Sequence, residues 1–215
     1  ARAGLSREAA LAFANEFHDE PGDPAKDDPF DVAIWRATQE GAPAWPSPWG
    51  PGRPGWHAEC TAMALSTYGS SLDLHAGGSD LRFPHHAYES AQAEAFTGVS
   101  PFSRAWMHVG MVRAGEAKMA KSAKNLVLVS DLLRDHAPAA IRLLLLRRVW
   151  SESWSFEPAE LAVAETELEA LFSASARPGN DAGGAATEAV LAALRADLDV
   201  PRALQIALAD GGAAA

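Results

Sequence analysis

The stretch from residue 56 to residue 96 restricts the chain to folds that combine helices with strands. Residues 57–68 predict a helix, and the glycine that follows them is typical of a helix end. Residues 72–75 alternate apolar and polar side chains, as a strand does, and lead into a glycine-containing turn predicted at 77–80. Residues 85–96 predict a second helix, because a proline stands just before it. Helix, strand, turn and helix in this order indicate an α/β fold.

Three side chains in this stretch carry donor atoms that metal ions use. Cys60 is the only cysteine of the chain, and His85 and Glu89 stand four residues apart in the second predicted helix, where they share a face. Sulfur, imidazole nitrogen and carboxylate oxygen all bind zinc. On spacing alone two other interpretations stay open, because a lone cysteine is often a small buried apolar residue and an HHxxxE run is often a solvated helix face.

The segments around this stretch also alternate in type. Residues 5–17 predict a helix with a serine cap. Residues 41–56 contain five prolines and three tryptophans, which exclude a helix and favour an ordered loop packed by Trp45 and Trp49. Residues 107–112 predict a buried strand, and 125–129 a short strand or extended piece. These elements extend the α/β pattern to residue 129.

From residue 130 on, the pattern is helical. Ser130 is placed to cap a short helix, and Pro138 and Pro158 each open a longer one. A low-complexity linker at 177–186 precedes two further predicted helices. We therefore expect an α/β part over residues 1–129 and a helical domain over residues 130–215.

Composition narrows the class of protein. The 18 Lys and Arg against 28 Asp and Glu give a formal charge of −10, which argues against a large polyanion as the main partner. A single cysteine excludes an internal disulfide and suits a reducing compartment. No apolar run approaches membrane-spanning length and no signal-peptide pattern opens the chain. We expect a cytoplasmic protein that acts without a membrane.

Three segments carry a resemblance to a known family. GRPGWHAEC at 52–60, GGSDLRFPHH at 77–86 and KMAKS at 118–122 resemble, in this order and spacing, the cysteine-activating class I synthetases. The resemblance covers roughly residues 19–160 and implies a Rossmann-like nucleotide-binding fold followed by a helical domain. Two branches share this core: cysteine–tRNA ligases, and the mycothiol-pathway ligases that join cysteine to the amine of glucosaminyl-inositol.

The resemblance implies one Zn²⁺ ion per chain as a cofactor. Cys60 and His85 match two of its ligands, and a third ligand, a cysteine, belongs to a motif upstream of residue 1. Glu89 matches an additional carboxylate ligand found in the tRNA ligases and generally lacking in the mycothiol branch. Zinc that binds the substrate thiolate directly separates cysteine from serine, whose hydroxyl is a harder and less acidic donor.

The resemblance also implies where the cysteinyl adenylate binds. Trp56 matches a tryptophan that packs beside the bound cysteine. Gly78, Ser79 and Asp80 match residues that contact the adenylate, and a glycine turn lets backbone N–H groups approach a ligand. Val112 falls where the main chain of the family meets the adenine. Without the family, Trp56 is equally well a core residue and GGSD only a turn.

KMAKS matches the class I signature KMSKS, a mobile loop whose lysines neutralise charge on the phosphates of ATP, which is bound with Mg²⁺. The resemblance implies that Lys121 makes the main contact in the transition state and that Lys118 supports it. Two departures stand beside this match: Ala120 replaces a serine, and Lys124 stands where the family usually has a glycine. An exposed lysine turn without a catalytic role is the competing interpretation.

These features favour a monomeric ligase of the mycothiol branch, with cysteine, ATP and an amino-sugar inositol as its small-molecule partners. A cysteine–tRNA ligase is the alternative, favoured by His75 and Glu89, and only this alternative has tRNA as a partner. The class I HIGH signature is not in these residues, so we expect this chain to be inactive alone. A degenerate paralogue or fragment is a further hypothesis, and a purely structural zinc module explains neither GGSD nor KMAKS.

Overall fold

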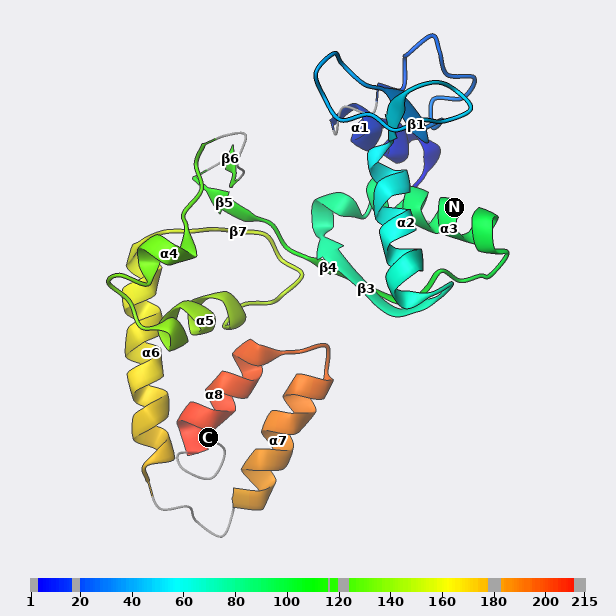
Figure 1. Cartoon of the computed structure of the whole chain (residues 1–215). Helices are drawn as coiled ribbons and strands as arrows, with labels where there is room; N and C mark the ends of the chain where they lie inside the picture. The colour runs from blue at the N-terminus through cyan, green and yellow to red at the C-terminus, as the bar shows by residue number, and fades with distance from the viewer. Residues whose placement is uncertain (1–3, 17–19, 116, 120–123, 178–182, 211–215) are drawn as a thin grey trace. The chain divides into compact units, whose positions relative to one another are not determined.

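The computed structural model of the chain describes residues 4–16, 20–115, 117–119, 124–177 and 183–210 (Figure 1). The chain divides into two compact units, Ala1–His108 and Val109–Ala215. This division rests on compactness, whereas the division expected between residues 129 and 130 rests on a change from a mixed to a helical sequence pattern. The expected division therefore stays a prediction. Among the described residues, no helix combines the length and the apolar character needed to cross a membrane.

Among its described residues, the first unit contains three α-helices, of which the second and third pack against each other, and two small pairs of strands. Strands β1 and β2 are antiparallel, and β3 and β4 lie side by side beneath α2 and α3 (Figure 1). The elements of this part are α1 (Arg7–Glu16), β1 (Trp35–Ala37), β2 (Gly52–Pro54), α2 (Trp56–Tyr68), β3 (Leu72–Gly78), a 3₁₀ turn (Ser79–Leu81), α3 (His85–Thr97) and β4 (Ser103–Val109).

The interior of the first unit is unusually polar. Its one large fully buried apolar side chain among the described residues is Phe102, whose backbone C=O accepts a hydrogen bond from the N–H of Leu72 at 2.8 Å. Around it lie buried polar side chains, namely His57, Thr61, His85, His86, Glu89, Ser90 and Ser103. Burying a polar group costs free energy unless a partner satisfies it. The stability of the fold gives no reason to bury these polar side chains, so the cluster is a candidate functional site.

The second unit combines a three-stranded sheet with a group of helices. The sheet has the order β6–β5–β7, with β5 antiparallel to β6 and parallel to β7. Its elements are β5 (Val112–Ala114), β6 (Ala117–Lys118), α4 (Val129–Leu132), α5 (Pro138–Leu146), β7 (Trp154–Ser155), α6 (Ala159–Ser175), α7 (Gly183–Arg195) and α8 (Val200–Asp210). Helix α5 packs on α6 through Ile141, Leu144, Leu161 and Ala164, and α7 packs on α8.

Most of the predicted helices are present, including α2 and α3, which end at Tyr68 and Thr97. The short strand considered at 125–129 does not form, because β5 already pairs with β6 on one side and β7 on the other, whereas the alternative of an extended piece holds at Leu128, whose backbone is extended. Helix α4 begins at Val129, so Ser130 lies inside the helix and does not cap it.

Two expectations about loops are also wrong. Trp45 and Trp49 are 55% and 76% exposed, so their rings do not pack the proline-rich loop. Backbone hydrogen bonds order it instead, since the N–H of Trp45 donates to the C=O of Gly52 at 2.7 Å and the N–H of Gly52 donates to the C=O of Trp45 at 3.0 Å. The linker expected at 177–186 is shorter, because α7 already begins at Gly183.

Candidate functional site

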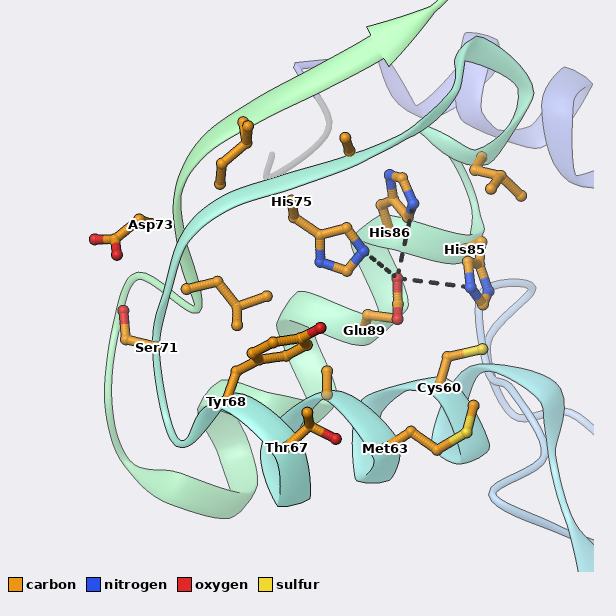
Figure 2. Close-up of a pocket in the computed structure, with 15 residues that line it drawn as sticks. Cys60, Met63, Thr67, Tyr68, Ser71, Asp73, His75, His85, His86 and Glu89 are labelled. Atoms are coloured by element: carbon orange, nitrogen blue, oxygen red, sulfur yellow. Dashed lines mark ion pairs between the residues drawn. The ribbon is translucent and has the colours of Figure 1, made fainter.

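The centre of the polar interior is the carboxylate of Glu89 on α3, which is 2% exposed. Three imidazoles point their Nε2 atoms at its Oε2 atom: His75 and His85 at 3.6 Å each, and His86 at 3.9 Å (Figure 2). His75 comes from β3, whereas His85 and His86 open α3. The Oε2 atom has no hydrogen-bond partner among the described residues.

The spacing of these donor atoms suits a metal ion better than hydrogen bonds. A hydrogen bond between nitrogen and oxygen is about 2.7–3.2 Å long, which is shorter than all three separations. Ligands that bind zinc at about 2.0–2.3 Å stand roughly 3.3–3.8 Å apart along the edges of a tetrahedron. The orphaned carboxylate oxygen and the surrounding nitrogens therefore fit the requirements of a cation.

Helix α2 adds sulfur to this group of donors. Cys60 lies half-buried on the side of α2 that faces α3, and its Sγ atom and donor atoms of His85 and Glu89 all lie within 4.8 Å of one another (Figure 2). A second set within the same limit is His75, His86 and Glu89. The structure thus brings together the three ligands that the sequence suggests, although their metal-binding role stays a prediction.

Two further histidines hold the rings that face Glu89. The Nδ1 atoms of His57 and His85 lie 2.7 Å apart, and Nε2 of His108 lies 2.8 Å from Nδ1 of His86. Each pair shares one N–H, so one ring donates and the other accepts. The Nε2 atoms of His85 and His86 are thereby left to face Glu89, as expected of histidines whose other nitrogen has a partner beyond the metal.

The sequence interpretation missed both of these histidines as members of the site. A signal existed for each. His57 precedes Cys60 by three residues, so the two share one face of α2. His108 follows Trp106 by two residues, so both point to one side of β4. Neither pattern identifies a partner until α2, α3, β3 and β4 are brought together.

Burial sets the charge state of the cluster. It lowers the pKa of His57 and of His85 to about 4 and that of His86 to about 3, with neighbouring imidazoles adding to the shift. Burial also raises the pKa of Glu89 to about 7. The pKa of the Cys60 thiol is raised by burial first and then by the Glu89 carboxylate. A divalent cation would reverse the shifts of the acids, since it stabilises thiolate and carboxylate.

Aromatic rings and one glycine fix the positions of the imidazoles. Trp56 stacks on His85 with ring centroids 4.3 Å apart and planes 19° apart, and Trp106 stacks on His75 at 4.9 Å and 18°. Trp56 is itself 54% exposed, so it is not a core residue and has surface left for a ligand. Gly77 lies so close to His86 that an added Cβ atom would stand 2.7 Å from its Cε1.

The predicted adenylate contacts lie at the end of β3. Gly78 is the last residue of the strand, and Ser79 and Asp80 begin the 3₁₀ turn that follows. The predicted turn at 77–80 is therefore half strand, and Gly78 has a φ of −65°, which any residue adopts. The closeness of β3 to the His86 ring, rather than a left-handed backbone, requires glycine at 77.

The remaining predicted site residues belong to the second unit. Val112 opens β5, and its C=O accepts a hydrogen bond from the N–H of Met119 at 3.0 Å. The backbone of Lys118 pairs with Arg113 in the β5–β6 hairpin. Lys121 lies outside the described residues. Lys124 has a φ of +54°, the left-handed conformation that the family's glycine would adopt freely.

These observations define an α/β protein with a candidate metal site built from buried histidine, cysteine and glutamate. Residues 5–166 match the family described as the class I (C) tRNA synthetase catalytic domain. Because the match covers most of the chain, the protein belongs to this family, in agreement with the resemblance found in the sequence.

Similar curated proteins fall into two groups. The chain is 46% identical to the L-cysteine:1D-myo-inositol 2-amino-2-deoxy-alpha-D-glucopyranoside ligase of Mycolicibacterium vanbaalenii over 94% of its own length and 47% of the relative's. It is 43% identical to the ligase of the same name from Thermobispora bispora, over 99% and 52%. It is 45% identical to the cysteine–tRNA ligase of Dehalococcoides mccartyi, over 75% and 35%. The chain thus spans about half the length of the first two relatives and 35% of the length of the cysteine–tRNA ligase.

A solved structure supports the fold. The chain resembles LeuRS in its ternary complex from Agrobacterium radiobacter with a TM-score of 0.51 at 12% identity, over 84% of this chain and 32% of the other. At this identity the likeness shows the fold alone. Together with the family match, it confirms the predicted α/β fold of the class I synthetase type.

Proposed function

We propose that the protein is a cytoplasmic ATP-dependent ligase that activates L-cysteine as cysteinyl adenylate and transfers it to the amine of glucosaminyl-inositol. The observation that carries this proposal is the convergence of Cys60, His85 and Glu89 within 4.8 Å. Ligases named for cysteine and this amino-sugar inositol, which align with nearly the whole chain, support the proposed acceptor.

In this proposal Cys60, His85 and Glu89 hold a zinc ion, which fits the orphaned oxygen of Glu89 and the spacing of the donors. Bound zinc supplies an open coordination position for the thiolate of the substrate, where serine is a much poorer ligand. His57 positions His85 through the 2.7 Å bond between their rings. The exposed face of Trp56 packs beside the bound cysteine and keeps water from it.

The residues for ATP are proposed on the family motifs. Gly78, Ser79 and Asp80, at the end of β3, contact the adenylate, and the carboxylate of Asp80 accepts a hydrogen bond from the cysteine ammonium or from a ribose hydroxyl. The main chain of Val112 meets the adenine. Its C=O is already engaged by Met119, so its N–H is the group proposed to contact the base.

Two lysines are proposed to act on the phosphates of ATP, which is bound with Mg²⁺. Lys121 neutralises the charge that builds on the phosphates in the transition state, and Lys118 supports it. Residues 1–129 would then form the catalytic domain, and residues 130–215 a helical domain of a monomeric enzyme.

A cysteine–tRNA ligase is the second candidate function, and one observation favours it. His75 and Glu89 are the residues that suit that branch, and the structure brings them together at 3.6 Å. The mycothiol branch ranks first because its members align with 94–99% of the chain, whereas the cysteine–tRNA ligase aligns with 75%. Both functions form the same adenylate and differ in the acceptor.

A binding experiment tests the part of the function that this chain carries. Zinc-loaded protein is titrated with L-cysteine and with L-serine in a calorimeter, beside the Cys60→Ser variant. We expect heat of binding for cysteine with wild type, none for serine, and at least a tenfold loss of zinc affinity in the variant. Equal zinc content and equal cysteine binding in wild type and Cys60→Ser would refute the proposed site.

A turnover experiment tests the acceptor. The complete gene product is incubated with ATP, Mg²⁺, zinc and cysteine, and AMP formation is compared with glucosaminyl-inositol and with cysteine tRNA. AMP formed only with the amino sugar supports the first function, and AMP formed only with tRNA supports the second. Absence of turnover with both acceptors would favour a degenerate paralogue. We expect the chain of 215 residues alone to give no cysteine-dependent pyrophosphate exchange.

A further inference from the structure

The histidine cluster holds more donor atoms than one cation needs. Beside Cys60, His85 and Glu89, a second set of three donors lies within 4.8 Å, formed by His75, His86 and Glu89. We propose that this second set binds a divalent cation of its own, next to the one held through Cys60, and that the two cations share the Glu89 carboxylate. This inference goes beyond the proposed function, which uses the Cys60 set only.

The donor geometry of the second set matches that of the first. The Nε2 atoms of His75 and His86 lie 3.6 Å and 3.9 Å from Oε2 of Glu89, both beyond hydrogen-bond length; the first distance is at the spacing of ligands around one ion and the second is just above it. Glu89 is 2% exposed, and its Oε2 atom has no hydrogen-bond partner among the described residues. A buried carboxylate oxygen without a hydrogen bond costs free energy that a bound cation removes.

Each set also has its own supporting histidine. His108 holds Nδ1 of His86 at 2.8 Å, as His57 holds Nδ1 of His85 at 2.7 Å. In both pairs the remaining nitrogen faces the same carboxylate. Trp106 stacks on His75 and so fixes the ring that completes the second set. Such supporting partners are typical of histidines that bind metal.

The site has room for two cations and for the molecules that complete their coordination. A pocket of about 750 Å³ is lined by Cys60, His75, His85, His86 and Glu89 among other residues (Figure 2). Oε2 of Glu89 faces the imidazoles of both sets, and one carboxylate oxygen can bridge two ions, which in two-metal sites stand about 3.5–4 Å apart. The thiolate of Cys60 and the carboxylate of Glu89 together supply negative charge that offsets part of the charge of the two cations.

The donor types indicate which cation each set prefers. The second set offers two imidazoles and one carboxylate without sulfur, a combination that binds Fe²⁺, Co²⁺ and Zn²⁺. Only the first set contains a thiolate. Cobalt therefore distinguishes the two, since thiolate bound to Co²⁺ gives an intense charge-transfer absorption and imidazole with carboxylate does not.

The test is a Co²⁺ titration of the metal-stripped chain, with bound metal measured after dialysis by mass spectrometry and absorption recorded in parallel. We expect two cobalt ions per wild-type chain. His75→Phe keeps an aromatic ring against Trp106 but removes the donor, so it should bind one ion and keep the charge-transfer band. Cys60→Ser should bind one ion and lose the band.

His136→Gln is the matched control, because His136 also pairs with a carboxylate, that of Glu165 at 2.7 Å, but lies in the other unit. It should bind two ions, and circular dichroism checks the fold of each variant. A single cobalt ion in the wild type, or two ions in folded His75→Phe, would overturn the second site. Because wild-type stoichiometry needs no variant, the proposal stays testable even if a substitution prevents folding. One ion with the thiolate band would sink this inference and leave the Cys60 site standing.

Discussion

At the scale of single residues, Gly77 determines how closely β3 approaches the histidines. A methyl group at this position would stand 2.7 Å from Cε1 and 3.0 Å from Nε2 of His86. The ring cannot move away freely, because His108 holds its other nitrogen at 2.8 Å. The smallest possible side chain at 77 is therefore a condition for the donor geometry around Glu89.

We predict that Gly77→Ala lowers the free energy of unfolding by about 1–3 kcal/mol, the range expected when a well-packed interior is overfilled. It should also weaken cobalt binding by the chain, because the displaced His86 ring no longer faces Glu89. Urea unfolding and cobalt titration measure the two effects. Gly22→Ala is the control, since no atom lies within 4 Å of its added Cβ. Equal loss in both variants would contradict this account.

The backbone of Lys124 adopts a strained conformation. Its φ of +54° is a left-handed conformation, which costs a residue with a Cβ roughly 1–2 kcal/mol and glycine almost nothing. We predict that Lys124→Gly raises the free energy of unfolding by up to about 1 kcal/mol, because part of the gain is offset by the flexibility of glycine in the unfolded chain. Lys124→Ala retains the Cβ and should bring no gain in urea unfolding. A gain for alanine equal to that for glycine would exclude backbone strain as the cause.

At the scale of elements, the contact between α5 and α6 is the apolar core of the second unit. Leu144 and Leu161 are each 2% exposed there, and Trp154 packs against them from β7. The guanidinium of Arg148 also stacks over the ring of Trp154, with its Cζ atom 3.7 Å from the ring centroid. Strand and helices are thus joined through one tryptophan.

Substitution of neighbouring leucines on α5 tests this core. We predict that Leu144→Ala lowers the free energy of unfolding by about 2–5 kcal/mol, since it leaves a cavity among buried side chains. Leu145 is the matched control, because it is 52% exposed and its change to alanine should cost less than about 1 kcal/mol. Urea unfolding followed by tryptophan fluorescence measures both. Similar losses for the two variants would show that α5 does not bury the side that faces α6.

At the scale of the whole molecule, the buried imidazoles link stability to pH. In the metal-free chain the pKa values of His57 and His85 fall from 6.5 to about 4, and that of His86 to about 3. Depressed values mean that the unfolded chain takes up protons that the folded chain refuses, so these residues lose their stabilising effect as the pH falls from 6.5. Glu89 acts in the opposite sense, since its pKa rises from 4.5 to about 7 and acid favours its folded state.

Three histidines outweigh one carboxyl group, so we predict that the urea midpoint of the metal-free chain falls between about pH 6.5 and pH 4. The Glu89→Gln variant removes the opposing contribution and should fall more steeply over the same window. A midpoint that rises on acidification in wild type would contradict the assignment of neutral buried histidines. Measurement at constant ionic strength separates this effect from screening of surface charge.

Much of this arrangement is predictable from local patterns, and the failures have physical causes. The helices at 57–68 and 85–96 were predicted because a glycine follows one and a proline precedes the other, and both are local signals. Of the two alternatives at 125–129, the short strand is absent because pairing depends on a free neighbouring strand, and β5 has none, which leaves the extended piece. The tryptophans of the proline-rich loop failed because burial depends on what packs against them.

The sequence by itself determined the order of helices and strands, the family, and the presence of sulfur, imidazole and carboxylate donors, because motifs and periodicity are properties of short segments. Only the tertiary structure decided which donors meet. His57 and Cys60 come from α2, His75 from β3, His85, His86 and Glu89 from α3, and His108 from β4. Their distances depend on how these four elements pack, and packing is a property of the folded chain that no single segment carries.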